Sequence, residues 1–164
     1  CTAIPSRIPR VAGFTVGEFV RLSLAPNSSA FSRLDPSAET MVERSLSCLG
    51  ITHLEDSDIS CISDGEFQKA CIAVALSRKA DVILLDEPTA FLDVDNRIAL
   101  LETLSSLSHD EGKCIIFSSH DVTDAVHYAD RVLALCPDGT TCLSDRTMPK
   151  KSLLLQTCFP KLSI

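Results

Sequence analysis

The fold of this chain is decided by one stretch, Asp81-Val82-Ile83-Leu84-Leu85-Asp86-Glu87-Pro88-Thr89-Ala90. Its unbroken apolar run has the length of a strand and predicts a parallel strand that is buried on both faces. Pro88 has no N–H to donate, so the strand is expected to end before it. Asp86 and Glu87 therefore lie at the carboxyl end of the strand, where open α/β sheets bind ligands. A solvated acidic turn is the alternative to a ligand site.

Strands and helices alternate after this run. The predicted elements are helices at 95–109 and 121–129, buried strands at 114–117 and 132–136, and a short antiparallel strand at 140–143. The helices are indicated by apolar residues at helical spacing, and the strands by short apolar runs between turn residues. The order strand–helix–strand–helix–strand favours right-handed crossovers and a parallel sheet. This half of the chain is therefore predicted to be α/β.

The half of the chain before the run is predicted to be helical. Two of its helices are expected to open with capping boxes, formed by the pairs Thr15 with Glu18 and Ser63 with Glu66. The helix that begins after Ser63 also has an amphipathic pattern. Its predicted apolar face consists of Phe67, Ala70, Cys71, Val74 and Ala75.

A further helix is predicted between these two. It is expected to begin at Pro36, because proline is favoured at the first helical position, and to end near Gly50, a plausible C-cap. Residues 51–62 are expected to form a short connection. Residues 1–13 show no clear period, so no element is predicted for them.

The composition narrows the class of protein. The formal net charge is −7 and no Lys/Arg cluster has the density of a nucleic-acid surface, so no nucleic-acid partner is expected. No apolar run has membrane-spanning length, and residues 1–5 lack the apolar core of a signal peptide. The eight cysteines include no C-x-x-C pair and are predicted to be reduced thiols in the cytoplasm rather than a disulfide framework. The scattered histidines argue against a Cys/His zinc site.

Four motifs stand in the order and structural context of one protein family. They are Ser63-Asp64-Gly65-Glu66-Phe67-Gln68-Lys69, Asp86-Glu87, Pro88-Thr89-Ala90-Phe91-Leu92-Asp93 and Ser118-Ser119-His120-Asp121. In this order they resemble the signature motif, the Walker B carboxylates, the D-loop and the switch histidine of ABC-type ATPases. The resemblance covers residues 14–143. It implies an α/β fold, with a partial P-loop NTPase (ABC ATPase) core, a parallel sheet and an N-terminal helical subdomain.

The resemblance implies a site for ATP and Mg²⁺ beside the two carboxylates. In the family's scheme Asp86 orients the Mg²⁺ shell and Glu87 polarises the attacking water. His120 is expected to hydrogen-bond the γ-phosphate and to link it to that water. Considered alone, a histidine such as His120 is more often one that only ends a buried strand.

The resemblance also assigns nucleotide contacts to Ser63, Gly65, Glu66 and Asp93. Ser63 and the Gly65 N–H are expected to reach the γ-phosphate of nucleotide on a second subunit, in a head-to-tail dimer. Two structural alternatives remain open: Ser63 with Glu66 is a helix cap, and Asp93 caps the helix that follows it. The chain departs from the family at Asp64, where a second glycine is more common, and at Glu66, where glutamine is. Both acids reduce the attraction for a phosphate.

The resemblance further predicts how the chain is divided. A helical subdomain is expected over 1–79, the Walker B, D-loop and switch-histidine part of the core over 80–145, and a tail over 146–164. None of the six glycines forms a G-x-x-x-x-G-K-[ST] phosphate loop. The family's glutamine loop is expected before residue 1. The 164-residue chain alone is therefore expected to be inactive as an ATPase.

The implied function is that of the ATP-binding and ATP-hydrolysing subunit of an ABC transporter, most like importers of iron–siderophore, haem or cobalamin. Its expected partners are a second ATP-binding subunit and membrane-embedded permease subunits, which would hold it at the cytoplasmic face of the cell membrane. Two alternatives stand beside this one. They are a soluble ABC ATPase outside transport, and a non-catalytic ABC remnant that acts as a dimerisation module.

Overall fold

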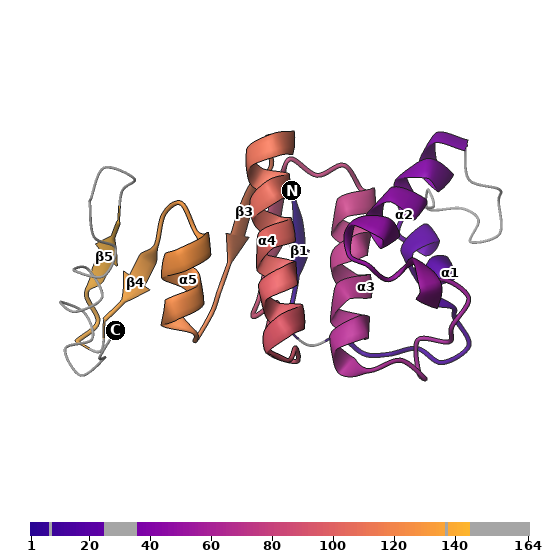
Figure 1. The fold of residues 1–164 in the computed structure, drawn as a ribbon, viewed down its shortest axis with the longest axis horizontal. Helices are drawn as coiled ribbons and strands as arrows, with labels where there is room; N and C mark the ends of the chain where they lie inside the picture. The colour runs from indigo at the N-terminus through magenta and orange to yellow at the C-terminus, as the bar shows by residue number, and fades with distance from the viewer. Residues whose placement is uncertain (7, 25–35, 137, 145–164) are drawn as a thin grey trace. The chain divides into compact units, whose positions relative to one another are not determined.

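The computed structural model describes residues 1–6, 8–24, 36–136 and 138–144 (Figure 1). The predicted tail, 146–164, lies outside these residues. The chain divides into two compact units, Cys1–Ser118 and Ser119–Ile164. In chain order the elements are β1 Thr2–Ile4, α1 Val16–Leu22, α2 Pro36–Cys48, the 3₁₀ helix η1 Thr52–Leu54, α3 Asp64–Ser77, β2 Val82–Leu85, α4 Val94–Glu111, β3 Cys114–Phe117, α5 Val122–Tyr128, β4 Leu133–Leu135 and β5 Thr141–Leu143.

The first unit contains a parallel sheet of three strands in the order β1-β2-β3. The predicted strand in the 81–90 stretch is β2, at the centre, with Ile83 opposite Thr2 on one side and Ile115 on the other. No local signal in residues 1–13 indicated β1. A strand of three residues is too short to show a period, and its partner β2 lies about 80 residues further along the chain. Its pairing is therefore a long-range feature.

The prediction that β2 is buried on both faces is wrong for one face. Ile83 and Leu85 are buried, and they belong to a core cluster that also contains residues of α3 and α4. Leu84 points to the other face and is 36% exposed, and its register partner Ile116 is 55% exposed. An apolar run shows that a strand tolerates burial, but it does not show whether a layer covers each face.

Helix α3 is buried on all sides rather than on one face as predicted. Its buried residues run almost without a break from Gly65 to Ser77 and include the polar Gln68. The reason is its position, because α3 packs against α1 and α2 on one side and β1 on the other (Figure 1). A helix enclosed in this way forms the centre of the core.

The predicted helix ends in the first unit are largely confirmed. Thr15 and Glu18 form a capping box at the start of α1, and α2 begins at Pro36. After α2, Gly50 has φ +67°, and the N–H of Ile51 donates to the carbonyl of Leu46 at 3.0 Å. This arrangement is a Schellman motif, which favours glycine at the left-handed position.

The second unit differs from the prediction in its sheet. β4 was expected to join the parallel sheet, but it pairs with β5 in a separate antiparallel sheet, with Leu133 opposite Leu143. Gly139, at φ +84°, lies in the short turn between them, so the pairing is local. The antiparallel strand predicted at 140–143 is confirmed as β5. No helix among the residues that the structure describes is long and apolar enough to cross a membrane.

Candidate functional site

The two carboxylates lie in a tight turn at the end of β2. The Asp86 N–H donates to the Ile4 carbonyl at 3.0 Å and extends the pairing with β1. Glu87 has φ +48°, a left-handed conformation that is uncommon for a residue with a side chain. Pro88 follows and is fully buried. The strand therefore ends where the proline predicted, and the backbone turns sharply at Glu87.

The Asp86 side chain is held from both neighbouring strands. Its Oδ1 accepts a hydrogen bond from the Ser118 hydroxyl at 2.7 Å, just beyond the end of β3. Its Oδ2 accepts a longer bond of 3.4 Å from the Ser6 N–H, just beyond the end of β1. Asp86 thus lies where the carboxyl ends of all three parallel strands meet, as expected for a ligand site in an open sheet.

The chemistry of this turn fits Mg²⁺ better than a transition metal. The groups present are carboxylate and hydroxyl oxygens from Asp86, Glu87 and Ser118. Among the described residues there is no cluster of three or more His, Cys, Asp or Glu that could enclose a metal. Magnesium is commonly bound by one or two carboxylates together with water and substrate phosphates, so it does not require such a cluster.

The predicted switch histidine follows β3 in sequence. His120 belongs to the second unit, Ser119–Ile164, and lies next to Asp121, the N-cap of α5. The Asp121 carboxylate accepts from the N–H of Thr123 at 3.0 Å and of Asp124 at 3.1 Å. Within the second unit His120 therefore directly precedes a capped helix. Its contact with phosphate stays a prediction.

The predicted signature turn is a complete capping box at the start of α3. The Glu66 N–H donates to the Ser63 hydroxyl oxygen at 3.3 Å, and the Ser63 N–H donates to the Glu66 carboxylate at 2.8 Å. The Ser63 hydroxyl also donates to this carboxylate, at 2.7 Å. The pKa of Glu66 is lowered mainly by the hydrogen bond from the Ser63 side chain, and further by the one from the Ser63 backbone. The capping alternative is thus confirmed, and the phosphate contact stays a prediction.

Gly65 lies against the D-loop rather than in open space. A Cβ atom on Gly65 would come within 2.7 Å of the Leu92 side chain and 3.1 Å of the Phe91 carbonyl oxygen. The absence of a side chain at Gly65 therefore lets this segment approach the start of α3. The predicted role of Gly65 was close approach of a phosphate, and the described structure shows close approach of the chain itself.

Asp93 ends the D-loop segment and is the N-cap of α4. Its carboxylate accepts from the Asn96 N–H at 2.8 Å, and hydrogen bonds from Asn96 lower the pKa of Asp93. The Lys69 ammonium on α3 donates to the Asn96 side-chain oxygen at 2.6 Å. Helix α3 and the first turn of α4 are thus joined by a direct polar contact. The capping alternative for Asp93 is confirmed, and its contact with nucleotide stays a prediction.

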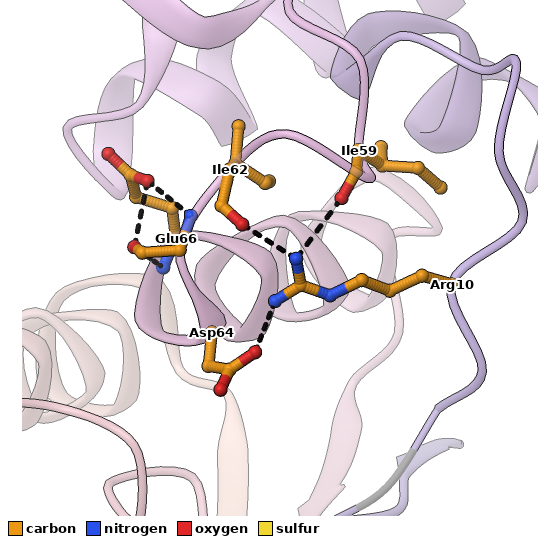
Figure 2. A network of polar contacts seen from close by, with 6 residues as sticks. Arg10, Ile59, Ile62, Asp64 and Glu66 are labelled. Carbon is orange, nitrogen blue, oxygen red and sulfur yellow. Dashed lines mark hydrogen bonds and ion pairs between the residues drawn. The ribbon is translucent and has the colours of Figure 1, made fainter.

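Sequence reasoning missed Arg10, which supports the loop before α3. Its guanidinium donates to the carbonyls of Ile62 at 2.6 Å and Ile59 at 3.4 Å, and it forms an ion pair with Asp64 (Figure 2). It also lies 4.8 Å from the centre of the Phe67 ring, within range of a cation–π interaction. Arg10 lies about 50 residues before these partners, in a segment without periodicity, so no local signal indicated it. Its positive charge also offsets the acidic Asp64 in the predicted signature motif.

Replacing Arg10 is expected to destabilise the first unit. Arg10→Ala leaves two loop carbonyls without their charged donor and removes the contact with Phe67, so the free energy of unfolding should fall by about 2 kcal/mol. Arg10→Lys should recover only part of this loss, because lysine lacks the planar fork. Urea unfolding followed by circular dichroism measures both variants.

Arg44 provides a matched control for this experiment. Like Arg10, it pairs with a carboxylate, here that of Glu111, but its side chain is 62% exposed compared with 25% for Arg10. Arg44→Ala is therefore expected to change the free energy of unfolding by less than about 1 kcal/mol. Equal losses for Arg10→Ala and Arg44→Ala would contradict the supporting role of Arg10.

Comparison with known proteins identifies the class of ATP-binding cassettes. A protein-family model described as ABC transporter matches residues 9–90. The chain belongs to this family. The solved structures similar to it include a metal-chelate type ABC transporter in an inward-facing conformation, with a TM-score of 0.81 and 23% identity over 96% of this chain and 63% of that one. They also include a dimeric bacterial ABC transporter cassette, with a TM-score of 0.69 and 21% identity. That match covers 80% of this chain and 56% of the cassette chain. The predicted fold, a partial P-loop NTPase core with a parallel sheet, is confirmed.

Several curated relatives are import or transport proteins. The ferric enterobactin transport ATP-binding protein FepC of Escherichia coli is 37% identical over 74% of this chain. The petrobactin import ATP-binding protein FpuD of Bacillus anthracis is 34% identical over 75%. The cobalamin import ATP-binding protein BtuD of Halobacterium salinarum is 33% identical over 77%. The chain spans only 45% of the first two relatives and 31% of the third.

Proposed function

We propose that this chain forms part of the ATP-binding subunit of an ABC transporter that imports an iron chelate, haem or cobalamin. The observation that carries the proposal is the turn at Asp86 and Glu87, where three parallel strand ends meet in a chain of the ABC family. The importer assignment is supported by relatives named for ferric enterobactin, petrobactin and cobalamin. The importer assignment is more specific than membership of the ABC transporter family.

In the proposed mechanism the turn after β2 prepares the site for phosphoryl transfer. The hydrogen bonds from Ser118 and Ser6 hold the Asp86 carboxylate, which would orient the water shell of Mg²⁺. Glu87 orients the attacking water and accepts its proton, and His120 donates a hydrogen bond to the γ-phosphate. When bound, Mg²⁺ offsets the negative charge on the phosphate oxygens. Positioning and electrostatic stabilisation thus provide most of the rate enhancement.

The proposed assembly contains two copies arranged head to tail. Ser63, Gly65, Glu66 and Asp93 would contact nucleotide held mainly by the other copy. In this arrangement residues 1–79 form the helical subdomain and residues 80–145 the Walker B part of the core, with 146–164 as a tail. Membrane-embedded permease subunits would hold the pair at the cytoplasmic face of the membrane. The dimeric cassette among the similar structures supports pairing.

The proposed ATPase activity requires a phosphate loop, and residues 1–164 contain none. We therefore expect the 164-residue chain to bind Mg-ATP much more weakly than the complete subunit, and to show no turnover. Calorimetry and a phosphate-release assay on both proteins test this. Micromolar affinity of the short chain would mean that another element binds the phosphates. A complete subunit that fails to hydrolyse ATP in the presence of its permease would contradict the proposed function.

A further inference from the structure

The Ser118 hydroxyl contacts both residues of the carboxylate pair. It donates a hydrogen bond to Asp86 Oδ1 at 2.7 Å and accepts one from the Glu87 N–H at 2.9 Å. The direction of each bond is unambiguous, because an ionised carboxylate only accepts and a backbone N–H only donates. A hydroxyl has one proton and two lone pairs, so it can make both bonds at once. One small side chain therefore links the two proposed catalytic positions.

The backbone of Ser118 is itself fixed by the sheet. Its N–H donates to the Leu85 carbonyl at 3.0 Å, which continues the β2–β3 pairing by one residue beyond Phe117. The hydroxyl therefore projects from a backbone whose position is set by the pairing of these strands. Regular elements of this kind hold a site more accurately than loops do.

Glu87 needs such support more than an ordinary strand residue does. Its φ of +48° is unfavourable for any residue other than glycine. Such conformations persist only where the surrounding structure holds them. The bond from the Glu87 N–H to Ser118 fixes the peptide plane between Asp86 and Glu87. This plane determines where the Glu87 side chain leaves the backbone.

We propose that Ser118 is a positioning residue of the ATPase site, which sets the orientation of the Asp86 carboxylate and of the Glu87 backbone through its hydroxyl. The inference rests on the proposed function. Ser118 does not react or contact the phosphate in this scheme. It acts through the two residues that do, so its removal should affect the chemical step more than nucleotide binding.

The test uses the complete subunit and two variants of nearly equal shape. Ser118→Thr keeps the hydroxyl, whereas Ser118→Val replaces it with a methyl group, and both suit the end of a strand. Ser118→Val is expected to lower kcat for ATP by about 10- to 100-fold, the usual effect of losing a residue that orients a metal ligand. KM should change by less than about threefold. Ser118→Thr should retain most of the wild-type kcat.

A second measurement does not depend on activity. Hydrogen exchange of the Glu87 amide in the nucleotide-free protein should be severalfold faster in Ser118→Val than in the wild type, and close to wild type in Ser118→Thr. Ser45→Ala is a matched control, because it also removes a serine hydroxyl, one that donates to the Met41 carbonyl at 2.7 Å within α2. It should alter neither kcat nor Glu87 exchange.

The outcomes separate this inference from the proposed function. Equal kcat in the threonine and valine variants, or equal Glu87 exchange in them, would overturn the positioning role. A wild-type subunit without ATPase activity would count against the proposed function. In that case the difference in Glu87 amide exchange between Ser118→Val and Ser118→Thr would still decide whether the Ser118 hydroxyl holds the Glu87 backbone.

Discussion

Glu87→Gln in the complete subunit is expected to leave ATP binding intact and to lower ATP hydrolysis by on the order of 10² or more. Glutamine keeps the shape of the side chain and one acceptor oxygen, but it removes the charge that polarises the attacking water. The turn should also survive, because the bond from the residue 87 N–H to Ser118 belongs to the backbone. Binding is measured by calorimetry and hydrolysis by phosphate release.

Glu102→Gln is a suitable control for this experiment. Glu102 is an exposed glutamate on α4, so its substitution removes one negative charge away from the turn and should not change hydrolysis. Hydrolysis near the wild-type rate in Glu87→Gln would show that Glu87 is not the catalytic base. His120 would then become the better candidate.

The second large effect is expected in mixed dimers of the complete subunit. One copy carries Ser63→Arg and the other carries Glu87→Gln. If Ser63 serves nucleotide held by the other copy, both lesions fall in the same composite site. The second site stays intact, so hydrolysis should continue at a rate limited by coupling between the two sites.

The reciprocal arrangement provides the control, because it contains the same two substitutions. With Ser63→Arg and Glu87→Gln in one copy and a wild-type partner, each composite site carries one lesion, and hydrolysis should collapse. Loss of the Ser63 cap is worth about 1 kcal/mol of stability, and it is common to both arrangements. Equal activity in the two mixed dimers would leave the turn at Ser63 as a helix cap alone.

Local sequence was sufficient for the features that depend on neighbouring residues. The capping boxes at Thr15 and Ser63 and the C-cap at Gly50 were predicted and are present. Each involves residues three to five positions apart, so the whole interaction is contained in a short segment. The position of Asp86 at a strand end was predictable for the same reason, because the apolar run and Pro88 are adjacent to it.

Features that depend on distant partners were decided only by the tertiary structure. The periodicity of α3 indicated one buried face, but packing against α1, α2 and β1 buries it on all sides. The short β1 exists through its pairing with β2, and Leu84 of β2 is partly exposed because no layer of the described residues covers that face. The choice of β5 as the partner of β4 also required the structure.

The candidate site combines both kinds of information. The sequence alone identified Asp86 and Glu87, since a strand end needs no distant partner to be recognised. It did not indicate that Glu87 is left-handed or that Ser118 would contact both residues. Ser118 lies about 30 residues further along the chain, and only the parallel pairing of β2 with β3 brings its hydroxyl to the turn. Strand pairing is a long-range interaction, and therefore the support of the site was decided by the fold rather than by local sequence.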